Sequence, residues 1–157
     1  MDETQFNETN FVLLKEGKIP EFNQQRKKYP NLKINLAGVN LSETDLSDAD
    51  LKEADLSKTD LSKTRLTWTD LTRADLHNAN LKEADLTNAK LHKANLSGVD
   101  LTDAKLYRSN LSYVDLSYAN LTGTNFYNGD EYEVDITCTN LTGADLKNSG
   151  LKDIDVK

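Results

Sequence analysis

Cysteine is almost absent from this chain of 157 residues, in which Cys138 stands alone. A disulfide within the chain and a metal site built on cysteines are therefore excluded. No long apolar run is present, so the sequence predicts no membrane span. The first residues, MDETQFNETN, are acidic and lack a basic segment followed by an apolar one. They argue against a secretory signal and favour a cytoplasmic location.

Motifs that carry catalytic chemistry are also missing. The sequence contains no glycine-rich phosphate loop, no nucleophile elbow and no paired cysteine and histidine. Acidic residues are abundant, with 26 Asp and Glu against 19 Lys and Arg, but they recur at fixed repeat positions. We expect them on solvated corners, where no cleft shifts their acidity. The sequence therefore predicts no enzyme activity and no cofactor.

What the chain has instead is a leucine at every fifth position from Leu36 to Leu121. A small or β-branched residue, such as Ala54 or Thr59, lies two positions before each leucine, and the residue between them is mostly Asp or Asn. On a helix this period would scatter the leucines around the axis, and on a long strand they would alternate between faces. A three-residue strand followed by a two-residue polar turn places both apolar residues inside. The pattern predicts an all-β solenoid.

The repeated unit, A(D/N)LXX, resembles the signature of the pentapeptide-repeat family and runs through nearly all of residues 32–157. The resemblance implies a right-handed, four-sided β-helix in which four pentapeptides make one coil. At the spacing of paired strands, about 4.8 Å, roughly six coils would form a rod about 30 Å long. Residues 1–31 do not repeat, and we predict that they form a short N-terminal helical cap on the β-helix of residues 32–157.

The cap is predicted to contain two helices. Asn7-Glu8-Thr9 is expected to cap the first helix, which would end at Gly17, and Pro20 is expected to open the second, Glu21–Lys28. Their apolar residues are Phe11, Leu14, Ile19 and Phe22.

Two roles for the cap are open. A solenoid's first coil exposes leucines and a row of unpaired strand edges, so a lid is expected there, and a dimerisation element is the alternative. The far end keeps the repeat almost to Lys157. A monomer and an end-to-end homodimer are both compatible with this pattern.

One interruption falls between Asp130 and Asp135, where Glu131 takes the place of a leucine and Ile136 resumes the period. A carboxylate in a leucine layer would be costly. We therefore expect a bulge that carries Glu131 to solvent while Val134 and Ile136 return to the core. The segment is either a tolerated corner loop or a binding loop.

Residues twenty apart should stack, which sorts the residues before the leucines into four faces. The first face is predicted to hold Asn35, Asp55, Asp75, Asn95, Asp115 and Asp135, and the second Asn40, Asp60, Asn80, Asp100, Asn120 and Asn140. The third face is predicted to hold Asp45, Arg65, Asp85 and Lys105, and the fourth Asp50, Asp70, Lys90, Asn110 and Asp130. The first two faces are polar to acidic, whereas the third alternates in sign.

Basic and aromatic residues gather in a band around the middle of the third and fourth faces. We predict as candidate protein-binding residues Arg65, Trp68, Arg73, His92, Lys93, Lys105, Tyr107 and Arg108. Tyr113 and Tyr127 occupy turns of the same faces. One interpretation is that Arg65, Lys90 and Lys105 merely neutralise ladders of aspartates. The large aromatic residues beside arginine instead favour a recognition surface.

The function predicted from these features is that of a rigid, non-catalytic scaffold or protein-binding module. The basic band would suit an acidic protein partner, and we expect neither direct nucleic-acid binding nor membrane binding. His77 and His92 fall on different faces and cannot share a metal ion, so no metal site is predicted.

Two other functions are weighed. The resemblance implies as the main alternative a DNA mimic that modulates type II topoisomerase (gyrase), and the net charge of −7 is compatible with it. Family members that act in this way commonly carry projecting loops or a C-terminal pairing module, which this sequence does not show. An ice-binding array is weaker, because charged residues such as Glu43 and Lys63 interrupt the Ser/Thr columns.

Overall fold

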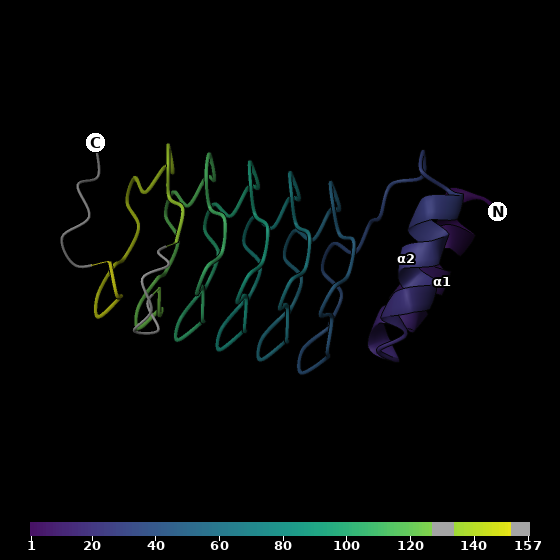
Figure 1. Ribbon diagram of the computed structural model, residues 1–157, viewed down its shortest axis with the longest axis horizontal. Coiled ribbons are helices and arrows are strands. Elements are labelled where there is room, and N and C mark those ends of the chain that lie inside the picture. The colour runs from purple at the N-terminus through teal and green to yellow at the C-terminus, as the bar shows by residue number, and fades with distance from the viewer. Residues whose placement is uncertain (127–133, 152–157) are drawn as a thin grey trace.

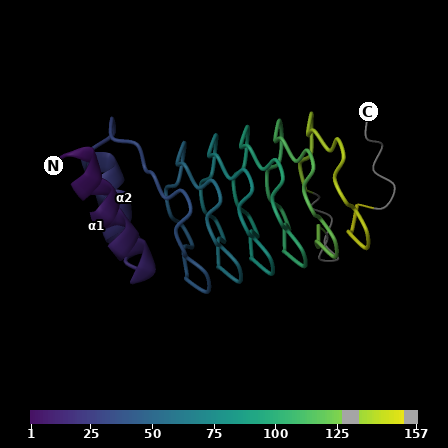
Figure 2. The same cartoon turned by 180° about the vertical axis from the view of Figure 1, so that it is seen from behind.

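The protein is an elongated stack of coils with two helices packed at its N-terminal end (Figure 1). The computed structural model describes residues 1–126 and 134–151. Helix α1 spans Glu3–Lys15 and helix α2 spans Ile19–Lys28. Seen from behind, the coils follow one another along a single axis that begins at helices α1 and α2 (Figure 2).

Strand pairing in the described residues takes the form of isolated parallel bridges, each joining one residue to its counterpart in the next coil. Asn35 bridges Asp55, and Asp55 in turn bridges Asp75, so that bridged residues lie twenty positions apart. The Leu36 amide donates to the Asp55 carbonyl oxygen at 2.8 Å, and the Asp55 amide donates to the Ile34 carbonyl oxygen at 2.9 Å. Each coil thus satisfies the backbone of its neighbours, and the predicted solenoid is confirmed.

The interior is filled by the leucines and by the small residues two positions before them. Leu41, Leu71 and Leu91 are fully buried, as are Ala54 and Ala84. Buried threonines at the small position satisfy their own hydroxyl groups by donating to a leucine carbonyl oxygen in the preceding coil. These threonines include Thr59, Thr64, Thr69 and Thr124. In the described part of the chain, the buried side-chain polar atoms without a hydrogen-bond partner belong to Asn10 and Gln25 of the helices, and none belongs to the leucine layers.

The Asp or Asn before each leucine has a structural reason. Its side-chain oxygen accepts the backbone amide two residues later, as Asp55 does from Ser57 at 3.0 Å and Asn110 does from Ser112 at 2.9 Å. This side-chain turn competes with extended structure and bends the chain at the corner. The second residue of each turn then takes a left-handed conformation, for example Trp68 at φ 61°. The same left-handed conformation occurs where Arg65, Lys90 or Lys105 precedes the leucine, at Trp68, Lys93 and Arg108, so the Asp or Asn supports the corner and the stacking of coils also maintains it.

Beyond Phe126 the predicted stacking was wrong. Asn110 bridges Asp135 and Asp115 bridges Asn140, an offset of twenty-five residues instead of twenty. Asp135 therefore lies on the fourth face and not the first, and Asn140 lies on the first face and not the second. Five added residues leave the phase of the leucine position unchanged but move the later bridged residues, Asp135, Asn140 and Asp145, by one face. Periodicity alone could not reveal that shift.

The predicted bulge at Glu131, together with Asp130 and Tyr127, lies outside the described residues. On its far side Val134 and Ile136 are partly buried against the hydrophobic core, as predicted. Leu141 and Leu146 continue the packing in the same partly buried manner.

The first helix begins earlier than predicted. Asp2 is its N-cap, and the Asp2 side chain accepts the Gln5 amide at 2.9 Å. Asn7, which was predicted to cap the helix, instead accepts the backbone amide of Asn35 through its side-chain oxygen at 2.9 Å. The prediction failed because Asn7 serves the first coil, a contact that no local pattern encodes. The second helix begins at Ile19, one residue before the predicted Pro20, and ends at Lys28, as predicted.

The helices cover the open edge of the first coil. Asn23 donates to the Asp48 carbonyl oxygen at 2.9 Å and accepts the Asp50 amide at 2.8 Å. Arg26 donates to the carbonyl oxygens of Asp50 at 3.2 Å and Lys52 at 2.8 Å. These side chains take the place that a preceding coil would occupy, since they pair backbone groups that would otherwise be open.

Apolar contacts accompany those hydrogen bonds. Of the four predicted apolar residues, Leu14 and Phe22 are fully buried, Ile19 is 8% exposed, and Phe11 is partly buried. Phe6, which the prediction omitted, is also fully buried and meets Tyr29 edge to face at 5.9 Å. The boundary between a cap domain at residue 31 and the β-helix stays a prediction.

Candidate functional site

All eight candidate residues lie on the third and fourth faces, as the ladders of bridges define them. Arg65 bridges Asp45 and Asp85, and Lys105 bridges Asp85 and Asn125, on the third face. The turns of that face carry Trp68, Tyr107 and Arg108, and the turns of the fourth face carry Arg73, His92 and Lys93. The two faces follow each other around the rod, so the structure places the candidates on adjoining surfaces.

Several of the candidate cations are paired with carboxylates one coil below. Arg65 lies 3.3 Å from Asp45, and Lys105 lies 3.9 Å from Asp85. Arg73 lies 3.5 Å from Glu53, and both of those side chains are about two-thirds exposed. Such exposed pairs contribute little stability and exchange readily with other partners. The pairs support the interpretation that these cations neutralise nearby carboxylates. The cations nevertheless stay exposed at the surface.

Asp70 is the best shielded carboxylate of the band, with a side chain 17% exposed. Lys52 approaches it at 3.3 Å and Lys90 at 4.0 Å. Burial alone would raise the pKa of Asp70, but hydrogen bonds from Thr72 and the ion pair with Lys52 hold it below the ordinary value. Asp70 is therefore a stable anion that fixes two lysines on the fourth face.

His92 belongs to a small cluster on the same face. Its Nδ1 lies 2.8 Å from the Ser112 hydroxyl oxygen, and its ring meets Tyr113 edge to face at 5.6 Å. The Lys93 ammonium lies over the Tyr113 ring, 5.8 Å from the centroid. These contacts hold Tyr113 on two sides while 54% of it stays exposed. Rigid, exposed aromatic rings beside cations are typical of recognition surfaces.

The aromatic residues of the third face differ from one another. Trp68 is 61% exposed, whereas the Tyr107 hydroxyl accepts a hydrogen bond from the Asn125 side chain at 2.8 Å. Tyr118 on the first face was missed as an exposed aromatic residue, although it is 74% exposed. Its ring lies against Gly143, where an added Cβ would come within 2.8 Å of the ring. The spacing from Tyr113 to Tyr118, one pentapeptide, could have signalled it.

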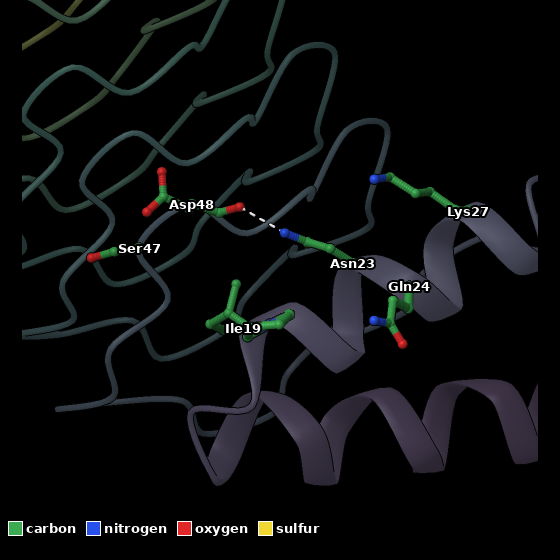
Figure 3. A pocket seen from close by; sticks show the side chains of 7 residues that line it. Ile19, Asn23, Gln24, Lys27, Ser47 and Asp48 are labelled. Carbon is green, nitrogen blue, oxygen red and sulfur yellow. Dashed lines mark hydrogen bonds between the residues drawn. The ribbon is translucent and has the colours of Figure 1, made fainter.

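A shallow pocket of about 490 Å³ lies where helix α2 meets a turn of the third face (Figure 3). Ile19, Gln24 and Lys27 line its helical side, and Ser47 and Asp48 line the other. The hydrogen bond from Asn23 to Asp48 crosses it, so the pocket is the seam between cap and coil.

Within the described ranges, His, Cys, Asp and Glu nowhere gather in a group of three that could hold a metal ion. Neither α1 nor α2 is long and apolar enough to cross a membrane, and no other helix occurs in the described part of the chain.

The fold resembles several solved structures. A pentapeptide repeat protein from Nostoc PCC 7120, alr5209, has a TM-score of 0.51 and 27% identity, with 62% of this chain and 84% of that one covered. Rfr23 from the cyanobacterium Cyanothece 51142 is 29% identical, with a TM-score of 0.45, and covers 75% of this chain. This chain spans 63% of the length of Rfr23.

A third pentapeptide repeat protein, AT2G44920 from the Arabidopsis thaliana thylakoid lumen, is 31% identical over 65% of this chain and 71% of that one, with a TM-score of 0.43. Comparison with curated proteins gave no match. A family profile described as pentapeptide repeats matches residues 34–73, 69–106 and 91–128 of the sequence. Those matches cover more than half of the sequence, and the chain therefore belongs to the pentapeptide-repeat family.

Proposed function

We propose that this chain is a rigid, non-catalytic protein-binding or scaffold module that docks an acidic partner on the middle of its third and fourth faces. The observation that carries the proposal is the sorting of charge around the rod. Residues 64–73, 84–93 and 104–113 form those two faces and contain six Lys and Arg but two Asp and Glu. Residues 74–83, 94–103 and 114–123 form the other two faces and contain five Asp and Glu but one Lys.

Such sorting supports docking because a surface of one sign steers an oppositely charged partner and fixes its orientation. The weak ion pairs of Arg65, Arg73 and Lys105 can be exchanged for contacts with that partner at small cost. Trp68 supplies the exposed aromatic anchor that charge balance alone would not require. The finer architecture, a right-handed, four-sided rod of about six coils, and a cytoplasmic location belong to the same proposal.

The experiment is affinity capture from the native host with the wild-type chain and a triple variant, Trp68→Ala, Tyr107→Ala and Arg108→Ala. A control triple variant, Lys58→Ala, Asn78→Ala and Tyr118→Ala, changes turn positions of the first face, including one exposed aromatic residue. We expect the first triple variant to lose the captured partner and the control to keep it. Equal recovery of the partner by both variants, each folded like the wild type, would show that the binding surface does not lie on the third and fourth faces.

A second candidate function is the DNA mimic that modulates type II topoisomerase. The aspartates of the first two faces favour it, since Asp75 and Asp115 on the first face and Asp60 on the second place negative charge along the rod. However, Asn80 donates to Asp60 at 3.1 Å, and Asn95 donates to Asp75 at 3.0 Å. These amides engage the carboxylates and weaken the negative field, so we rank the mimic second.

A further inference from the structure

One corner of the rod carries a straight column of exposed side chains. Glu53, Arg73, Lys93 and Tyr113 occupy the second turn position of the fourth face in successive coils, with φ angles from 57° to 59°. The turns are held in register by backbone hydrogen bonds from Arg73 to His92 at 2.9 Å and from Lys93 to Ser112 at 3.1 Å. Since all four residues share one backbone conformation, their side chains leave the rod in the same direction.

Along the column the side chains change from acidic (Glu53) through two basic residues to aromatic (Tyr113). Among the described residues, the ion pair of Arg73 is the exposed one with Glu53 at 3.5 Å. Lys93 lies over the Tyr113 ring, and no ion pair joins it to a carboxylate of the described residues. Asp70, a carboxylate of the same face, is already engaged by Lys52 and Lys90. Arg73 and Lys93 therefore offer two cations to a partner.

The spacing of the column selects the shape of that partner. Successive coils are about 4.8 Å apart, the distance between paired strands. An α-helix laid along the rod presents one side chain per turn, about every 5.4 Å. An extended strand presents side chains to one side only about every 6.7 Å. Over three intervals the mismatch is about 2 Å for a helix and about 6 Å for a strand, so a helix stays in register.

We propose that this corner column binds an amphipathic, acidic α-helix of a partner protein, and that the helix lies along the rod. This inference rests on the proposed function. Two carboxylates, one helical turn apart, pair with Arg73 and Lys93, and an apolar side chain of the next turn packs on Tyr113. A basic side chain of the preceding turn meets Glu53. Charge complementarity sets both the register and the direction of the helix, because the column reads differently from its two ends.

The probe is a fluorescently labelled synthetic helical peptide that carries Lys, Glu, Glu and Leu on successive turns of one face, measured by anisotropy at low salt. A second peptide has the same composition with those four residues scattered around the helix. We expect the first peptide to bind and Lys93→Glu to weaken it about tenfold or more, the effect of one reversed contact pair. A peptide with Lys in place of the facing Glu should recover the loss.

The matched control is Lys58→Glu, which reverses the same charge at the same turn position, φ 57°, on the first face. Thermal melting checks that both variants fold, and Lys93→Gln replaces Lys93→Glu if the reversal unfolds the chain. Equal binding of the scattered peptide, an equal loss in Lys58→Glu, or no binding at about 1 mM peptide would overturn the helix proposal. Loss of the captured partner in the Trp68 triple variant would still uphold the proposed function in that case.

Discussion

At the scale of single residues, the leucine column decides stability. Leu91 is fully buried between the equivalent leucines Leu71 and Leu111 of neighbouring coils. Leu91→Asp places an unpaired charge in a dry layer, and we expect a loss of at least about 4 kcal/mol in the free energy of unfolding. Chemical denaturation measures this loss. Lys58→Asp, an exposed turn substitution, should change the free energy by less than about 0.5 kcal/mol. Unaltered stability of Leu91→Asp would contradict the inward assignment.

The aspartates with lowered pKa values make the stability of the fold depend on pH in the acid range. Hydrogen bonds from Ser47 lower the pKa of Asp45, and contacts with Thr72 and Lys52 lower that of Asp70 despite its burial. A carboxyl with a lower pKa in the folded state stabilises the fold above its unfolded pKa, about 3.9, and that stabilisation disappears as pH falls through the folded pKa. We expect melting temperature to fall below about pH 4 and to fall less steeply in Asp70→Asn. An identical acid slope in that variant would exclude Asp70 as a contributor.

At the scale of elements, we expect the helices to act as a lid. Deleting residues 1–30 removes the side chains of Asn7, Asn23 and Arg26 that pair with the first coil, and exposes its leucines. We expect aggregation or end-to-end association of the truncated chain, detected by light scattering and size-exclusion chromatography. A monomeric truncation as stable as the full chain would count against the lid.

A milder change tests the same seam between lid and coil. Arg26→Ala leaves the carbonyl oxygens of Asp50 and Lys52 without this donor, and we expect a loss of about 1–3 kcal/mol in stability. The control is Lys27→Ala, an exposed neighbour on the same helix, which should be close to neutral. If both variants melt at the wild-type temperature, hydrogen bonding at this edge is not what holds the lid.

At the scale of the whole molecule, the two proposed functions predict opposite results with gyrase. The cationic third and fourth faces would fit a DNA-binding groove badly, and asparagines engage part of the acidic columns. We expect neither inhibition of supercoiling nor protection of purified bacterial gyrase at about 1 µM protein, a concentration that would reveal specific binding. The assay needs a known inhibitor as a positive control. Clear activity of the wild-type chain would promote the DNA mimic over the binding module.

The sequence by itself determined the solenoid and the inward residues from Leu36 to Leu121. A period of five fits neither a helix nor a long strand, so one arrangement of strand and turn accommodates it. Stacking at twenty residues then followed from the family resemblance and placed Arg65 and Lys93 on the correct faces. Asp and Asn before the leucines were visible as a pattern, whereas their side-chain turns became clear only in the folded chain.

Tertiary structure alone decided what depends on contacts between distant residues. Asn7 pairs with Asn35 and leaves the helix cap to Asp2, although both residues are good caps locally. The twenty-five-residue offset at Asp135 moves later residues to another face, because adding five residues preserves the leucine phase but rotates the chain by one side. Tyr113 joins His92 and Lys93 only where coils stack. A repeat determines what faces inward, but register and neighbours on the surface depend on how many residues each coil contains.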